Sequence, residues 1–224
     1  MNNFIRVKIC CISSVEEAML AIRYGASALG LVSEMPSGPG VIDEILIAEI
    51  SSKVPPPVAT FLLTSKQNAD EIIVQHLKTR TNTLQLVDHL PHSELMKLRE
   101  KLPAIKLVQV IHVLDKYSVE EASGVQNYVD ALLLDSGNPK LKVKELGGTG
   151  RTHNWEISRK IVEEVNIPVF LAGGLNPENA LEAIKFVQPY GLDICSGVRT
   201  KNLLSEEKLK LLFECVNKFN LNKV

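Results

Sequence analysis

Short apolar runs and amphipathic segments alternate along the whole chain. The first apolar run, from Phe4 to Cys10, is rich in β-branched residues and typical of a strand. A helical pattern follows, with a capping hydroxyl at Ser14 and a terminating glycine at Gly25. The alternation repeats without a change of composition that would mark a linker, which indicates parallel βαβ units with right-handed crossovers.

Eight such units predict an α/β protein that folds as a single (β/α)8 TIM barrel domain over residues 1–224. An open, doubly wound sheet is the alternative, but it would place its phosphate loop after the first strand. The predicted strands are residues 4–10, 28–32, 57–63, 83–87, 105–113, 129–135, 167–172 and 192–196. The predicted helices are residues 14–24, 42–53, 68–78, 91–101, 118–127, 155–165, 177–186 and 206–219.

Glycine-rich turns follow the sixth, seventh and eighth strands, and barrels favour the loops after strands seven and eight for phosphate. Glycine tolerates positive φ and lets backbone N–H groups approach an oxyanion closely. The first turn runs into a helix capped by Asn154, and a helix N-terminus suits a phosphate. A flexible connecting loop is the alternative interpretation. The candidate phosphate-binding residues are Gly148, Gly150, Gly173, Gly174, Ser196 and Gly197.

Composition and charge argue against several functional classes. A net charge of −1 gives no electrostatic reason to expect nucleic acid or a membrane surface as a partner. No apolar run approaches the roughly 20 residues needed to span a bilayer. The N-terminal residues enter a strand pattern at once and lack a secretory segment, so we expect a cytoplasmic protein.

The four cysteines contain no C-x-x-C pair, which argues against a zinc ribbon or a thioredoxin-type motif. Free thiols in a reducing compartment are therefore expected. Because the last strand neighbours the first in a closed barrel, Cys195 is expected to approach Cys10. A disulfide between these two residues would silence Cys10.

Candidate catalytic residues end the predicted strands, because barrel chemistry occurs at the C-terminal strand ends. Cys10 ends the first strand and Asp135 the sixth, while Gln85 lies near the end of the fourth. A thiolate serves as a base and a carboxylic acid as its complementary acid. Each also has a structural interpretation: Cys10 as a buried small hydrophobe, and Asp135 as a helix cap or loop-closing acceptor.

Five motifs in order resemble the phosphoribosylanthranilate isomerase family: 7–10 (VKIC), 133–136 (LLDS), 147–155 (GGTGRTHNW), 171–179 (LAGGLNPEN) and 193–198 (DICSGV). The resemblance implies an Amadori rearrangement of N-(5′-phosphoribosyl)anthranilate, in tryptophan biosynthesis, that needs neither metal nor organic cofactor. It implies that Asp135 is the general acid and Cys10 the general base. The glycine turns would hold the 5′-phosphate, and Gln85 would contact the substrate.

The departures from the family gather at the end of the site that would bind the aglycone. The family usually has Gly where Cys11 stands, and an Arg for the anthranilate carboxylate at about the position of Pro39. Its His after the fourth strand is replaced by Val87, and its usual Asp before Trp155 is Asn154. Loss of a charge-assisted Arg–carboxylate pair is expected to weaken anthranilate binding.

Several functional hypotheses therefore stay open. The chain is a diverged isomerase, a relative acting on another phosphorylated ribosylamine or aldose, or a catalytically silent sugar-phosphate binder. A ribulose-phosphate epimerase or an indoleglycerol-phosphate synthase would need strand-end residue sets that we do not find. The expected partner is a small phosphosugar, and the expected assembly is a monomer or homodimer. Arg199 and Lys201 add positive charge near the phosphate or form a solvated loop face.

Overall fold

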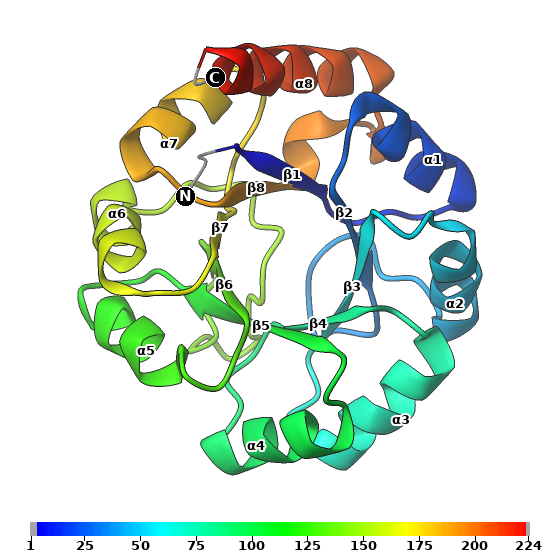
Figure 1. Ribbon diagram of the computed structural model, residues 1–224, viewed down its shortest axis with the longest axis vertical. Coiled ribbons are helices and arrows are strands. Elements are labelled where there is room, and N and C mark those ends of the chain that lie inside the picture. The colour runs from blue at the N-terminus through cyan, green and yellow to red at the C-terminus, as the bar shows by residue number, and fades with distance from the viewer. Residues whose placement is uncertain (1–3, 223–224) are drawn as a thin grey trace.

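The computed structural model describes residues 4–222 and forms a closed barrel of parallel strands inside a ring of helices (Figure 1). Each strand pairs in parallel with the next, and β1 pairs with β8 to close the ring. This confirms the predicted (β/α)8 barrel; the predicted domain extends beyond the described residues at both ends. The barrel strands are Arg6–Ile9 (β1), Ala28–Val32 (β2), Ala59–Thr64 (β3), Thr83–Leu86 (β4), Lys106–His112 (β5), Ala131–Asp135 (β6), Val169–Leu171 (β7) and Gly191–Ile194 (β8).

Eight α-helices among the described residues form the outer ring, and α8 lies between α7 and α1, where it completes the ring (Figure 1). Within residues 4–222, no helix is both long and apolar enough to cross a membrane. The helices are Val15–Tyr24 (α1), Glu44–Lys53 (α2), Ala69–Thr79 (α3), His92–Lys101 (α4), Tyr117–Val125 (α5), Trp155–Glu164 (α6), Ala180–Val187 (α7) and Glu206–Leu221 (α8).

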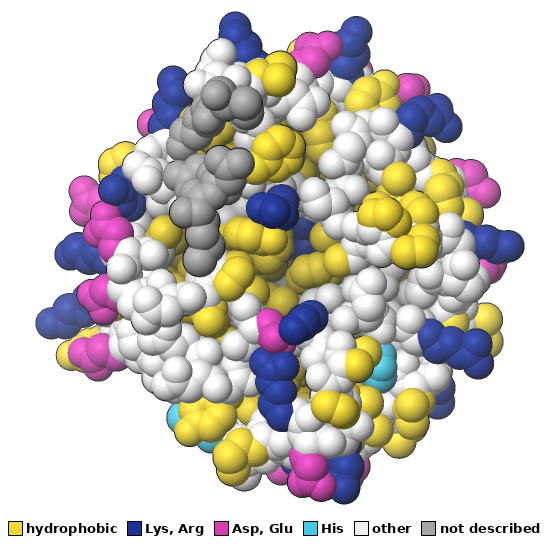
Figure 2. All heavy atoms as spheres, in the orientation of Figure 1, with side chains coloured by type: hydrophobic (Ala, Val, Ile, Leu, Met, Phe, Trp, Pro, Cys, Tyr) yellow, Lys and Arg dark blue, Asp and Glu magenta, His cyan; other side chains and the backbone are white. Residues whose placement is uncertain are grey.

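The strands divide their side chains between two cores because successive residues point to opposite faces. Val7 and Ile9 of β1 belong to the outer core between strands and helices, whereas Cys10 belongs to the core inside the barrel. Figure 2 shows one end of the molecule, where charged side chains occupy most of the perimeter and hydrophobic side chains lie nearer the centre. The helices thus face water with their polar sides and the barrel with their apolar sides.

The predicted helix caps form, and they fix how each loop enters its helix. The Ser14 hydroxyl accepts a hydrogen bond from the Glu17 N–H (3.1 Å), and Gly25 ends α1 with φ 112°. The Asn154 side chain accepts from the Glu156 N–H (2.9 Å) at the start of α6. These caps set the loops that carry the candidate site at the C-terminal ends of the strands.

Most elements begin or end one or two residues from the predicted boundaries, and two of the differences lie beside glycine turns of the candidate site. α7 begins at Ala180 rather than Pro177, because the Asn176 side chain accepts from the Asn179 N–H (3.0 Å) and forms a separate turn first. β8 ends at Ile194, and the next residues form a short 3-10 helix, η1 (Ser196–Val198). A small hairpin of β9 (Arg199–Thr200) and β10 (Leu203–Leu204), which the sequence pattern did not predict, follows.

Candidate active site

One pocket opens where the C-terminal ends of the barrel strands meet. Its wall includes the ends of β1, β4 and β6, the turns after β7 and β8, and the long loop between β6 and α6. Gly197 is the one predicted site residue that does not line it: a Cβ there would lie 1.9 Å from the Leu175 carbonyl oxygen, so this glycine packs two turns together. The predicted residues that line the pocket are Cys10, Gln85, Asp135, Gly148, Gly150, Gly173, Gly174 and Ser196.

Cys10 follows β1 directly and points into the barrel. Its backbone N–H donates to the Ile194 carbonyl (2.8 Å), which anchors it to β8. A Cβ at Gly30 would lie 2.6 Å from the Cys10 sulfur, so a glycine is needed on β2 to leave room for the thiol. Burial raises the pKa of the Cys10 thiol to about 11, although the Lys8 ammonium acts in the opposite direction.

An ion pair lies beneath Cys10 in the interior of the barrel. Lys8 Nζ lies 2.7 Å from Asp193 Oδ1, and the Lys8 side chain is fully buried. The two residues face each other in register across the β1–β8 seam. A Cβ at Gly30 would lie 2.9 Å from Lys8 Nζ as well, which places the ammonium beside the thiol. Burial alone would lower the pKa of Lys8, but Asp193 and the Cys10 thiolate together raise it.

Lys8 and Asp193 each lie in one of the five sequence motifs, but the motifs alone assign them no role. The signal that identifies them is a charged residue at an inward position of each of two apolar strands, the first and the last. In a closed barrel these strands are neighbours, and opposite charges buried at neighbouring inward positions are expected to pair. The consequence is a fixed positive charge next to the candidate base.

Asp135 ends β6, and its carboxylate faces the same pocket as Cys10. One oxygen accepts a hydrogen bond from the Ser136 N–H (2.7 Å), and the other lies where a Cβ on Gly147 would approach within 2.7 Å. The hydroxyls of Ser136 and Thr149 are 2.6 Å apart and hold the glycine loop against the end of the strand. The loop thereby covers the carboxylate and leaves it 8% exposed.

The glycine turns after β7 and β8 expose unpaired backbone donors to the pocket. Gly173 and Gly174 have φ of 78° and 63°, values that favour glycine. A Cβ at Gly174 would also lie 2.7 Å from the backbone of Arg151, so the two loops approach too closely for a side chain. Within residues 4–222, the backbone N–H groups of Gly173, Gly174 and Ser196 donate no hydrogen bond. Such groups can bind phosphate oxygens.

The expectation of free thiols is wrong for two of the four cysteines. Cys11 and Cys195 form a disulfide with a Cα–Cα distance of 5.8 Å, while Cys10 and Cys215 stay free. Cys195 was expected near Cys10, but its partner is the next residue. Cys11 has φ 61°, which is uncommon for a residue with a side chain, and this turn at the strand end brings Cys11 to the pocket together with Cys10.

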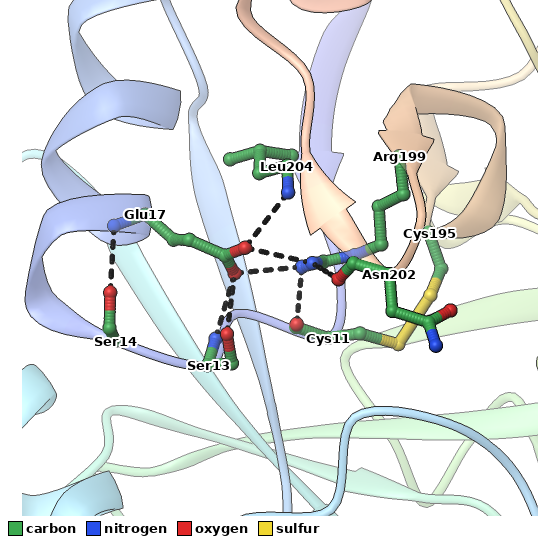
Figure 3. Close-up of polar contacts among 8 residues, drawn as sticks. All are labelled: Cys11, Ser13, Ser14, Glu17, Cys195, Arg199, Asn202 and Leu204. Carbon is green, nitrogen blue, oxygen red and sulfur yellow. Dashed lines mark hydrogen bonds and ion pairs between the residues drawn. A yellow bond between two sulfur atoms is a disulfide. The ribbon is translucent and has the colours of Figure 1, made fainter.

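Arg199 does not contribute charge to the phosphate turns as we had considered. Its guanidinium lies 2.9 Å from both oxygens of Glu17 and also donates to the Cys11 carbonyl (Figure 3). Both side chains of this ion pair are largely buried. Burial alone would raise the pKa of Glu17, but the hydrogen bonds from Arg199, Leu204 and Ser13 lower it. Arg199 is thus a structural link between the loops that follow β1 and β8.

The pocket has no cation on its wall among the described residues, including the side formed by the loop after β2. None of the described residues that line the pocket is a lysine or arginine. The loop after β2 closes on the loop after β6: the Ser37 hydroxyl donates to the Lys144 carbonyl (2.5 Å), and Pro39 packs against Gly148. Lys144 forms an ion pair with Asp88. Pro39, at about the position where the resemblance implies an Arg, therefore lines the pocket.

Two histidines near the site are held by other groups. His112 Nε2 lies 2.9 Å from the Val87 carbonyl, whereas its buried Nδ1 has no hydrogen-bond partner among the described residues. His153 Nε2 lies 2.7 Å from the Ser158 hydroxyl, and burial lowers the pKa of its ring to about 4 although Asp135 acts against this. His153 is therefore neutral at pH 7 and adds no positive charge. Among residues 4–222, no group of three His, Cys, Asp or Glu side chains is arranged to hold a metal ion.

Comparison with known proteins identifies relatives over almost the whole chain. A sequence model described as N-(5'phosphoribosyl)anthranilate (PRA) isomerase matches residues 7–215. N-(5'-phosphoribosyl)anthranilate isomerase 2 of Methanosarcina mazei is 37% identical over 203 residues, which cover 90% of this chain and 89% of that protein. The isomerase of Methanocella arvoryzae is 33% identical over 97% of this chain and 99% of its own length.

Solved structures show the same relationship. Phosphoribosyl anthranilate isomerase from Thermotoga maritima superposes with a TM-score of 0.82 at 26% identity, over 96% of this chain and 99% of that one. A phosphoribosyl anthranilate isomerase in complex with reduced 1-(o-carboxyphenylamino)-1-deoxyribulose 5-phosphate superposes with a TM-score of 0.79 at 25% identity, with the same coverage. The likeness thus extends through every strand that carries a site residue.

Proposed function

Because the chain belongs to the N-(5′-phosphoribosyl)anthranilate isomerase family, we propose that it isomerises N-(5′-phosphoribosyl)anthranilate with Cys10 as general base and Asp135 as general acid. The product is 1-(o-carboxyphenylamino)-1-deoxyribulose 5-phosphate, and the reaction is an aldose-to-ketose Amadori rearrangement in tryptophan biosynthesis. No bond is made to the protein in this reaction. The protein's task is to hold one substrate between an acid and a base.

The first step is protonation of the sugar ring oxygen by the Asp135 carboxyl group. The C1–O bond breaks, the nitrogen lone pair forms a C=N bond, and an open-chain protonated imine results. Asp135 suits this role because its carboxylate lies at the pocket wall beneath Gly147, with one oxygen held by the Ser136 N–H. The other oxygen is free of hydrogen bonds from the described residues and lies next to Gly147, which also lines the pocket.

In the second step the Cys10 thiolate removes the proton from C2 of the sugar. The C–H electrons form a C1=C2 bond, the imine nitrogen becomes an amine, and the resulting enolamine tautomerises to the ketose. A buried thiol with a raised pKa holds its proton at neutral pH, so the thiolate needs a compensating charge. The Lys8 ammonium, whose Nζ lies 2.7 Å from Asp193 Oδ1, lowers the pKa of the thiol, while burial and Asp193 raise it, and with all three in place the pKa is about 11.

The non-reacting phosphate supplies binding energy that positions the sugar. The unpaired backbone donors of Gly173, Gly174 and Ser196 would hold it, together with the loop that contains Gly148 and Gly150. Backbone donors on short turns between packed elements are preorganised for an anion. Gln85 lies on the same wall, and its buried Oε1 has no hydrogen-bond partner among the described residues, so it is free to accept a hydrogen bond from a substrate hydroxyl or amine.

The observation that carries this proposal is the meeting of Cys10, Asp135 and the three glycine turns in one pocket. The test is a direct assay with freshly made N-(5′-phosphoribosyl)anthranilate, comparing the wild type with Asp135→Asn and Cys10→Ala. Loss of a general acid or base is expected to lower kcat by a factor of about 10² to 10⁴. Wild-type turnover by either variant contradicts its assigned role.

A second candidate substrate is a phosphorylated ribosylamine or aldose without a carboxylate on its aglycone. The absence of lysine and arginine from the described pocket wall favours it, because a buried carboxylate without a cation is poorly stabilised. The discriminating measurement is kcat/KM for the anthranilate substrate against a ribosylamine that lacks the carboxylate. A higher value for the second compound would reassign the substrate and leave the acid–base roles unchanged.

We further propose a cytoplasmic enzyme whose fold is one domain and whose assembly is a monomer or homodimer. One solved structure shows monomers generated from the dimeric isomerase of Thermotoga maritima, so that protein has been obtained both as a dimer and as a monomer. Light scattering on the full chain distinguishes the two states. A higher oligomer would contradict this part of the proposal.

A further inference from the structure

The Cys11–Cys195 disulfide connects the two chemical parts of the pocket. Cys11 directly follows the candidate base, and Cys195 directly precedes the turn that carries Ser196. The two cysteines are 184 residues apart in sequence but adjacent across the β1–β8 seam. Figure 3 shows the bond beneath Arg199, between the loop after β1 and the turn after β8. The bond therefore holds the phosphate turn against the strand that carries Cys10.

Formation of this bond leaves the acid–base pair intact. Cys10 is free while its neighbour is oxidised, and Asp135 lies on another strand. Both bonded cysteines line the pocket, so a change in their separation moves the wall next to Ser196. Opening the bond is thus expected to alter how the substrate is held rather than the identity of the reacting groups.

A second link keeps the two loops together when the disulfide opens. Arg199 donates to the Cys11 carbonyl and pairs with Glu17, and Glu17 in turn accepts from the Leu204 N–H (2.9 Å). These contacts are largely buried and do not depend on sulfur oxidation. The thiols released on reduction therefore stay near each other, which is the condition for the bond to form again.

We propose that Cys11 and Cys195 are a reversible thiol–disulfide exchange site whose oxidised form tightens the phosphate-binding turn. The proposal rests on the proposed phosphate binding at Ser196, but it concerns affinity and not the chemical step. The reactants are small thiols and small disulfides. Cys11 is buried whereas Cys195 is half-buried, so a small thiol reaches the bond from the Cys195 side.

The exchange balances without any other reactant. In reduction, one thiolate of dithiothreitol attacks the Cys195 sulfur, the Cys11 thiolate leaves and takes a proton, and a mixed disulfide forms. The second dithiothreitol thiol displaces Cys195 as a thiol and leaves cyclic, oxidised dithiothreitol. In oxidation, one glutathione disulfide accepts both electrons from the two cysteines and gives two glutathione molecules and the protein disulfide.

Tethering favours binding because a preorganised turn loses less conformational freedom when the anion arrives. The oxidised protein is expected to bind inorganic phosphate about 3- to 10-fold more tightly than the reduced protein. For the same reason, reduction is expected to raise KM for the phosphorylated substrate by a similar factor and to change kcat less. A change in KM with little change in kcat is expected for a bond that positions the turn, whereas loss of a catalytic group would lower kcat.

The test compares the full chain after treatment with glutathione disulfide and after treatment with dithiothreitol, which is then removed under argon. Alkylation followed by peptide mass spectrometry verifies the state of Cys11 and Cys195, and calorimetry measures the affinity for inorganic phosphate. Cys11→Gly is the matched control, since glycine suits the positive φ at this position and cannot form the bond. Cys215→Ser controls for the free thiol on α8, the other free thiol being Cys10.

The expected result is a redox-dependent phosphate affinity in the wild type and in Cys215→Ser, and none in Cys11→Gly. Equal affinity of the two wild-type states, or a redox effect that persists in Cys11→Gly, overturns this proposal and leaves the isomerase proposal standing. Failure of glutathione disulfide to form the bond also overturns it. Absence of phosphate binding in both states would overturn the phosphate cradle and this proposal together.

Discussion

Under the proposed function, the pocket has two halves that are built in different ways. The catalytic half consists of Cys10 with its Lys8–Asp193 pair, Asp135, and the glycine turns, and its groups are fixed by strand ends and buried contacts. The aglycone half consists of the Ser37–Gly40 loop and the residues that it meets in the β6–α6 loop. It has no cation on its wall among the described residues.

The proposed function thus assigns anion binding and substrate choice to different parts of the barrel. A phosphate held by backbone N–H groups depends on where the turns lie and little on side-chain identity. Recognition of an aglycone depends on individual side chains in an exposed loop, where single substitutions leave the fold unchanged. We therefore expect the catalytic half to specify a reaction class and the aglycone half to decide which substrate enters it.

The largest expected effect is the pH dependence of the alkylation rate of Cys10, which belongs to the catalytic half. With a pKa of about 11, the thiolate fraction rises about tenfold per pH unit below that value. In oxidised Cys215→Ser protein, Cys10 is the single free thiol. Its alkylation by iodoacetamide should therefore accelerate about a thousandfold between pH 7 and pH 10. A rate that levels off near pH 8 would show that the thiol is less perturbed than its burial implies.

The next largest effect is on the alkylation rate of Cys10, which should change in opposite directions when Lys8 or Asp193 is replaced. Lys8→Met removes the positive charge beside the thiolate and should slow alkylation of Cys10 at pH 8 by a factor of about 10 or more. Asp193→Asn removes the negative charge that raises the pKa of the thiol and leaves the Cys10 thiolate as the partner that stabilises the Lys8 ammonium, so it should accelerate alkylation. Circular dichroism checks that each variant is folded. Equal rates in both variants would show that the pair serves the fold alone.

The smallest expected effect is a change in KM when Pro39 in the aglycone half is replaced. Pro39→Arg places a cation on the pocket wall opposite Gly148 and should lower KM for the anthranilate substrate about tenfold. Pro39→Gln, which has a long side chain without charge, is the matched control, and inhibition by inorganic phosphate should be the same in both. A KM that falls equally in the two variants would indicate release of the loop rather than binding of the carboxylate.

The fold was predictable because alternation of strands and helices depends on local pattern. Gly25 and the hydroxyl of Ser14 marked the limits of α1 correctly. The meeting of Cys10 with Asp135 followed from the rule that parallel strands bring their C-terminal ends together in a barrel. The sequence pattern could therefore predict which residues of the site lie at strand ends.

The Cys11–Cys195 bond and the Arg199–Glu17 ion pair could not be predicted from local sequence pattern, because both depend on the direction of side chains from distant parts of the chain. Alternation places Cys11 away from the pocket, and only its positive φ turns it toward Cys195. Arg199 has a charge that suits a phosphate, yet its buried pairing with Glu17 depends on a hairpin that no local pattern indicated. These contacts join the first and last parts of the chain, where sequence distance conceals proximity.

The central claim is that Cys10 removes the C2 proton from a sugar phosphate held in the catalytic half. The most direct test uses N-(5′-phosphoribosyl)anthranilate deuterated at C2 of the sugar, with release of deuterium to water followed over time. We predict that the wild type releases the deuterium during turnover, whereas Cys10→Ala binds inorganic phosphate normally and releases none. Release by Cys10→Ala at the wild-type rate would contradict the account.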